Sequence, residues 1–179
     1  MKNSTVLAAT GRDRVGLADD MAAAFSAYGI EIEESRMATL EGQFAMVVRI
    51  CGDSRQLTRL RGELPTLADK LGLHLDIKQK GRRRASAKGA PYVIESYSVG
   101  APGIGAVTAI LKRHNVNIED LETDASQTPL SPAITFRMKA RVAIPSTTSV
   151  SSLRTELRSL ERENDIDIVI RPATLAGVD

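Results

Sequence analysis

The sequence predicts an α+β protein built from two consecutive β-α-β-β-α-β modules. Apolar residues change between strand spacing and helix spacing in the same order in both halves of the chain. A glycine turn, followed later by a strand that reads Ile-Glu-acid, recurs after about 87 residues. A short basic stretch without periodicity separates the halves. We therefore expect a first module at 1–80, a linker at 81–89, a second module at 90–174 and a tail at 175–179.

The first half begins with a short apolar strand at 6–10. A helix follows, whose apolar residues recur at helical spacing: Leu17, Met21, Ala24, Phe25 and Tyr28. A second strand starts at Ile30, and Glu41-Gly42 predicts a hairpin into a third strand with alternating apolar residues: Phe44, Met46, Val48 and Ile50. We expect Ser54 to cap a second helix. Pro65 should kink or restart this helix, and Gly72 should end it before a fourth strand at 73–78.

The second half follows the same order. Strands are expected at 92–99, 116–123 and 134–144, and a fourth strand contains Ile166, Ile168 and Ile170. Two helices carry apolar stripes: Ile104, Val107, Leu111 and His114 in one, and Val150, Leu153, Leu157 and Leu160 in the other. This is the order of the ferredoxin-like fold, in which right-handed crossovers place both helices on one face of a four-stranded antiparallel sheet.

The other face of each sheet differs between the halves. The third strand of the first half offers that face a largely apolar set: Ala45, Val47, Arg49 and Cys51. The third strand of the second half offers a set that water can solvate: Thr135, Arg137, Lys139 and Arg141. We therefore expect the halves to pack on each other, and a homodimer is also consistent with an apolar sheet face.

Composition excludes several classes of protein. A single cysteine, Cys51, rules out an internal disulfide and is typical of the reducing cytoplasm, and its place in a strand favours a buried structural residue. No apolar run approaches the ~20 residues of a membrane span, and the N-terminus does not read as a signal peptide. The net charge is +2, with the basic excess confined to 81–89. We do not expect either module to bind nucleic acid directly.

The turn between the first strand and the first helix of each half is the candidate ligand site. Gly11 and Gly16 bracket this turn in the first half, and Gly100 and Gly103 bracket it in the second. Glycine lets a ligand approach the backbone, and the N–H groups of the following helix can hold a carboxylate. We expect the start of the second strand to lie beside this turn, where Asn117 could bond a carboxylate and an ammonium group. Glu31 takes that place in the first half. Ordinary turn chemistry is the alternative explanation.

Three segments resemble known sequences. The run Gly11 to Ala18 resembles the Asp-Arg-Pro-Gly-Ile turn of ACT domains, with Val15 where Pro is common. The segments 29–36 and 115–121 resemble their second strand. The segment 128–145 is similar to the long hairpin and third strand of the glycine cleavage system transcriptional repressor family. The resemblance extends over about residues 4 to 173.

The resemblance implies a cytoplasmic regulator that responds to an amino acid, with glycine as the first choice, and acts on transcription through a protein partner. ACT domains bind amino acids where two modules meet. Carried onto this chain, their site residues are Asp13, Gly16 and Leu17 in the first half, and Gly100, Gly103, Ile104 and Asn117 in the second. Two departures stand out, because Glu31 replaces the asparagine and Gly100-Ala101 replaces Asp-Arg.

The sequence contains no constellation that predicts catalysis. His74 alternates outward on a strand, and His114 lies near the end of a helix. The chain has no His/Cys cluster for a metal and no phosphate-binding or nucleophile motif. We therefore expect a protein that is not an enzyme and needs no cofactor. Two alternatives to the transcriptional regulator stay open: a free-standing regulatory subunit of an amino-acid metabolic enzyme, and an interaction module without a ligand.

Overall fold

The computed structural model describes residues 2–78, 89–100, 103–127 and 132–173, and divides into two compact units at 1–83 and 84–179. The first unit contains β1 (Asn3–Arg12), α1 (Leu17–Ala27), β2 (Glu31–Leu40), β3 (Gln43–Gly52), α2 (Ser54–Leu71) and β4 (Leu73–Lys78). The second contains β5 (Gly89–Val99), α3 (Ile104–Arg113), β6 (Asn117–Gln127), β7 (Ile134–Pro145), α4 (Val150–Asn164) and β8 (Ile166–Pro172).

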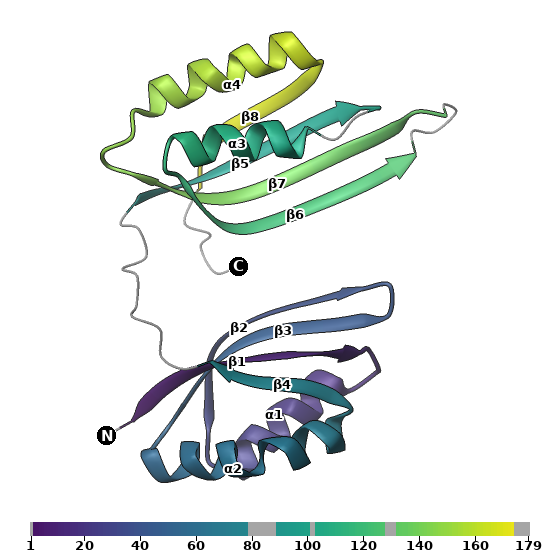
Figure 1. Ribbon diagram of the computed structural model, residues 1–179, viewed down its shortest axis with the longest axis vertical. Coiled ribbons are helices and arrows are strands. Elements are labelled where there is room, and N and C mark those ends of the chain that lie inside the picture. The colour runs from purple at the N-terminus through teal and green to yellow at the C-terminus, as the bar shows by residue number, and fades with distance from the viewer. Residues whose placement is uncertain (1, 79–88, 101–102, 128–131, 174–179) are drawn as a thin grey trace. The chain divides into compact units, whose positions relative to one another are not determined.

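Each unit is one four-stranded antiparallel sheet with two helices on one face (Figure 1). The strand orders are β2-β3-β1-β4 and β6-β7-β5-β8, so the first and third strands of each unit lie in the centre. The predicted fold class, two ferredoxin-like modules in tandem, is confirmed. We call the units the first and second module.

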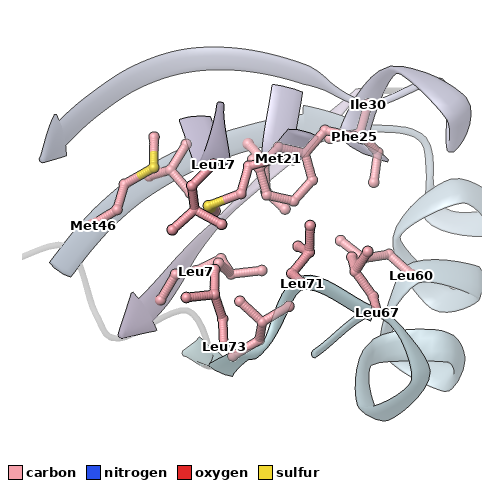
Figure 2. Close-up of a cluster of buried hydrophobic side chains, with 14 of the residues drawn as sticks. Leu7, Leu17, Met21, Phe25, Ile30, Met46, Leu60, Leu67, Leu71 and Leu73 are labelled. Carbon is pink, nitrogen blue, oxygen red and sulfur yellow. The ribbon is translucent and has the colours of Figure 1, made fainter. Parts of the chain in front are cut away.

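The core of the first module lies between its sheet and its two helices (Figure 2). Leu7 in β1, Val48 and Ile50 in β3 and Leu60 in α2 are fully buried. The second module has a core of its own, centred on Ile94, Val107, Leu111, Ala140, Val142 and Leu153. These are mostly the residues that the apolar periodicity selected, because a strand or helix buries the face on which its apolar side chains recur.

The second helix of the first module departs from the prediction at its start and in its middle. Asp53, and not Ser54, is the N-cap, because its carboxylate accepts a hydrogen bond from the Gln56 N–H at 2.8 Å. The Gln56 side chain accepts from the Asp53 N–H in return at 2.7 Å, which completes a capping box. The helix is not restarted at Pro65 but runs through it, and Gly72 ends it as predicted, with φ 67°.

The hairpin and the edge strand of each module add details that the sequence did not predict. Glu41 and Gly42 both have positive φ, as a two-residue hairpin turn of type I′ requires. The edge strands β2 and β6 each contain a bulge at the same place, Ile32/Glu34 and Ile118/Asp120. Gly89, expected to end the linker, instead begins β5 and pairs with Pro145. Residues 81–88 of the predicted linker and the tail at 175–179 lie outside the described residues.

The face opposite the helices has a different character in each module. In the first module, small apolar residues occupy the two central strands: Val6, Ala8, Ala45 and Val47. Charged residues of β2 and β4 flank this patch, among them Arg36 and Asp76. In the second module, acids of β6 face bases of β7 directly, as in the pairs Glu122–Lys139 and Asp124–Arg137. The apolar surface expected in the first module is therefore a central stripe with charged margins.

Candidate ligand site

The turn before α1 is held by hydrogen bonds and ion pairs of the first module itself. Gly16 caps the helix with φ 84°, a conformation that favours glycine. The Asp13 N–H donates to the Gly42 carbonyl at 2.8 Å, which joins this turn to the β2–β3 hairpin. Arg14 pairs with Asp20 at 2.6 Å, in the first turn of the helix. Leu17 is buried in the core, so its side chain is not available to a ligand.

The turn before α3 is built differently. Gly100 has φ 79°, and its N–H donates to the Ile134 carbonyl at 2.9 Å. Gly103 is the N-cap of α3 and needs no positive φ, since its φ is −76°. A Cβ at this position would lie 2.7 Å from Cδ1 of Ile166, so a larger residue would require the Ile166 side chain to move. Ala101 and Pro102, which the prediction placed within this turn, lie outside the described residues.

A cavity of about 300 Å³ lies beside the start of α3. Gly103 and Ile104, two of the predicted site residues, are part of its wall. Strands β5, β6 and β7 supply the rest: Ser96, Ser98, Thr123, Asp124, Ala125, Phe136, Arg137 and Met138. Ser96 and Ser98 are buried, and the Ser98 hydroxyl accepts a hydrogen bond from the Gly103 N–H at 3.3 Å.

The interior of the cavity presents hydroxyl groups and apolar groups. Met138 is a core residue, and the residues that pair with it across the sheet, Ser96 and Thr123, point to the same face. Asp124 and Arg137 alternate to the opposite face, where the Arg137 guanidinium lies 6.0 Å from the Tyr97 ring centre. These two charged residues therefore line the cavity with their backbone.

The start of the second strand does not lie beside the turn of its own module, contrary to the prediction. Asn117 and Pro91 both pair with Ala143, so Asn117 is level with the beginning of β5. The turn follows Val99, eight residues further along, which is a separation of about 26 Å at about 3.3 Å per residue.

Glu31 is likewise far from the turn of the first module. It and Ser4 both pair with Cys51, so Glu31 is level with the beginning of β1. The reason is topological. The helix carries the chain back along the sheet, so the second strand starts at the far end from the turn. Asn117 instead lies with Asn115 and Lys112 at a shallow hollow around the end of α3.

Sequence reasoning missed Ser96 and Ser98, although a signal was present. Tyr92 and Ile94 alternate inward along the predicted strand at 92–99, and the same alternation continues into Ser96 and Ser98. Hydroxyl groups at inward positions near the end of a strand indicate a polar pocket, because a buried polar group needs a partner.

A second polar cluster joins the helices of the second module. The His114 Nε2 lies 2.6 Å from Oε2 of Glu156, and Arg113 donates to the same carboxylate. The hydrogen bond from Arg113, then that with His114, lowers the pKa of Glu156 below its ordinary value. His114 is thus paired between helices, and this cluster has the character of a structural contact.

The described residues contain no group of three or more His, Cys, Asp or Glu side chains that could hold a metal ion. Burial raises the pKa of the Cys51 thiol, and so does its hydrogen bond with Glu33, which favours the unreactive thiol form. Within the described part of the chain, no helix is both long and apolar enough to cross a membrane.

The two ferredoxin-like modules, each with a glycine turn before its first helix, are typical of tandem regulatory domains. Comparison with known proteins agrees with this class. Residues 4–78 match the ACT domain model, so the first module is an ACT domain, and the second module repeats the same topology, which gives the chain a tandem ACT-type fold. It resembles the glycine cleavage system transcriptional repressor of Escherichia coli (strain K12), with 22% identity over 156 residues, which cover 87% of this chain and 82% of the repressor. The repressor of Shigella flexneri matches with the same identity and coverage.

Two solved structures share the fold over almost the whole chain. An unknown protein from Galdieria sulphuraria superposes with a TM-score of 0.82 and 28% identity, covering 97% of this chain and 100% of its own. A putative glycine cleavage system transcriptional repressor superposes with a TM-score of 0.69 and 20% identity, covering 96% of this chain and 97% of its own. The tandem arrangement of the two modules therefore occurs in other proteins.

Proposed function

We propose that this protein is an amino-acid-sensing regulator that controls transcription in the cytoplasm through a protein partner and does not bind DNA itself. The observation that carries the proposal is the cavity at the start of α3, which is lined by two of the predicted site residues, Gly103 and Ile104. The names of the Escherichia coli and Shigella flexneri relatives concern glycine cleavage, so glycine is the first ligand to test.

The proposed mechanism is a shift between conformations. A ligand that binds one arrangement of the α3 turn more tightly than another increases the population of that arrangement. A partner that distinguishes the two arrangements then binds more or less tightly by the same coupling free energy. This mechanism asks for no catalytic group, which agrees with the absence of a catalytic constellation from the sequence.

The proposed site contains Gly100, Gly103 and Ile104 together with the cavity residues. Asp13, Gly16 and Leu17 are the equivalent ligand contacts predicted for the first module, where Leu17 can offer only its backbone because its side chain is buried. Asn117 and Glu31 are predicted contacts at the starts of β6 and β2. The last two cannot share a ligand with the turn of their own module, given their separation along the sheet. Asn117 and Glu31 are therefore proposed as separate ligand contacts, and substitution of each residue alone tests its contribution to ligand affinity.

A thermal-shift panel of the amino acids tests the proposal. A ligand that binds only the folded protein and is present at 100 times its Kd stabilises it by about 2.7 kcal/mol. For a domain of this size, that raises the Tm by on the order of 10 °C. We expect glycine or another small amino acid to raise the Tm of the transition that belongs to the second module. If no amino acid raises either Tm at millimolar concentration, sensing is refuted.

The partner is proposed to dock on the apolar stripe of the first module, in which Val47 is 54% exposed. Exposed apolar stripes of this kind are typical of protein contacts. Val47→Glu should abolish capture of the partner in a pull-down. Lys139→Glu, on the charged face of the second module, should leave capture unchanged and is the matched control.

The same pull-down decides between the regulator and its main alternative. Recovery of a transcription regulator supports the proposal, and recovery of an amino-acid metabolic enzyme would instead indicate a free-standing regulatory subunit. A partner captured without any effect of an amino acid would indicate the third possibility, an interaction module without a ligand.

A further inference from the structure

We infer that the Ser96 hydroxyl and the first-turn N–H groups of α3 form a carboxylate site within the second module, and that the first module has no working counterpart. The ligand class is a small monocarboxylate. The identification of that monocarboxylate as an amino acid rests on the proposed function, whereas the carboxylate site rests on the geometry of the second module alone.

The start of α3 supplies backbone donors without competing acids. The first intrahelical hydrogen bond runs from the Val107 N–H to the Gly103 carbonyl, so the N–H groups of Ile104, Gly105 and Ala106 have no partner within the helix. No side chain caps this end, and no acidic residue occupies its first turn. The helix dipole and these N–H groups both favour a negative charge here, and of the three residues Ile104 lines the cavity.

The burial and position of the Ser96 side chain are a second, independent indication of a ligand. Its residue is 96% buried, since its exposed fraction is 4%, and its side chain lines the cavity. No hydrogen bond joins its hydroxyl to another residue in the part of the chain that the structure describes. Because its side chain lines the cavity, a carboxylate oxygen bound there would accept its hydrogen bond. Ser98, which accepts from the Gly103 N–H, positions the helix start beside it.

The first module places apolar groups at the corresponding positions. Ser96 pairs with Met138, and the equivalent pair in the first module is Ala9 with Met46. The next inward position is Ser98 in β5 and Gly11 in β1. The buried hydroxyl of the second module is thus replaced by a methyl group in the first.

The space is also closed in the first module. A Cβ on Gly11 would lie 2.7 Å from Cδ2 of Leu73, so no serine fits there without movement. Leu17 and Phe44 are both 2% exposed, whereas their counterparts Ile104 and Phe136 are only partly buried.

The charge at the start of the helix also favours the second module over the first as an anion site. Asp19 and Asp20 lie in the first turn of α1, so acidic side chains already occupy the positive end of this helix dipole, and Arg14 pairs with Asp20. Among the described residues, the comparison of the two helix starts therefore favours a carboxylate site in the second module over one in the first.

The size and lining of the cavity define the ligand. A volume of about 300 Å³ lies at the lower end of the range for small-molecule sites. Neither Asp124 nor Arg137 points its charge inward, so the interior supplies no carboxylate for the ammonium group of an amino acid, a group that acetate and propionate lack. A carboxylate at the helix start with a small remainder fits this lining. Glycine and alanine, or acetate and propionate, carry the same carboxylate from two different sources.

The test is calorimetric titration of the full chain with each of these four ligands. Ser96→Thr and Ser96→Val form an isosteric pair that differs only in the hydroxyl. We expect the valine variant to bind at least about ten-fold more weakly than the threonine variant, because one charge-assisted hydrogen bond is lost. Ser96→Ala should weaken binding similarly and fold normally, since Ala9 occupies the same position in the first module. Asp20→Asn, in the first module, should leave affinity unchanged.

The outcomes separate this inference from the proposed function. Equal affinities of the threonine, valine and alanine variants for glycine would overturn the site at Ser96 while leaving amino-acid sensing intact. Binding of acetate or propionate that depends on Ser96, without binding of glycine or alanine, would support the carboxylate site and overturn amino-acid sensing. Failure of all four ligands to bind the native chain would overturn this inference.

Discussion

Replacement of Leu60 by alanine should destabilise the first module and leave the second unchanged. Leu60 is fully buried in the core of the first module (Figure 2). Removal of a fully buried leucine side chain costs about 3 kcal/mol, from the lost transfer free energy and the cavity that remains. A module of this size has a stability of about 4–12 kcal/mol, so the loss is a large fraction of the total. The corresponding fall in the Tm of the first module is on the order of 10–20 °C.

Differential scanning calorimetry measures this effect, because each module should contribute its own transition. The two core clusters share no residue. Leu153→Ala is the matched control, since Leu153 is also fully buried and lies on the second helix of its module. It should lower the other transition by a similar amount.

The result that would refute this reasoning is a shared response. If Leu60→Ala and Leu153→Ala each lower both transitions equally, or if the native chain melts in one transition that both substitutions move, then the modules unfold as one cooperative unit. The separate cores would in that case not be separate units of stability.

Three further predictions concern single contacts. Glu156→Gln should lower the Tm of the second module at neutral pH. Because the folded pKa of Glu156 is lowered, this difference in Tm should shrink as the pH falls below the ordinary carboxyl value and the native carboxylate becomes protonated. A difference that does not shrink at all in acid would contradict the prediction. Asp53→Ala should cost the first module about 1 kcal/mol in urea unfolding by removing the cap on the Gln56 N–H, whereas Asp53→Ser should retain most of it. Asn117→Ala should not change the affinity for a ligand held at the start of α3, and a loss of affinity in calorimetric titration would mean that the site extends beyond the cavity.

Much of the fold was predictable because it follows from periodicity. Alternation fixed the inward residues of β3, such as Phe44 and Ile50, and helical spacing fixed those of α2, such as Leu60 and Leu67. The capping residue was missed by one position, because Asp53 and Ser54 are both good N-caps and only the reciprocal bond of Gln56 decides between them. Pro65 does not interrupt α2, and the local preference that predicts a break there is overridden by the burial of Leu60 and Leu67 on either side.

The site was predictable only in part, because it depends on which elements meet in space. Motif resemblance located Gly103 and Ile104, which do line the cavity. The resemblance also placed Asn117 in the same site as Gly103 and Ile104, which requires the second strand to start beside the turn. The crossover places it at the opposite end of the sheet. A single motif does not show in which direction a strand runs. Two residues that both belong to the family's site motifs can therefore lie far apart within one module.

The bulge in each edge strand also bears on the history of the chain. Periodicity does not demand an extra residue at Ile32/Glu34, and yet the same irregularity recurs at Ile118/Asp120. Two strands that evolved independently would have little reason to share an irregularity at the same register, whereas copies of one ancestral gene segment inherit it together. A shared bulge is therefore what duplication of one ancestral segment predicts, and the contrast between Ala9 and Ser96 is a difference between the two copies.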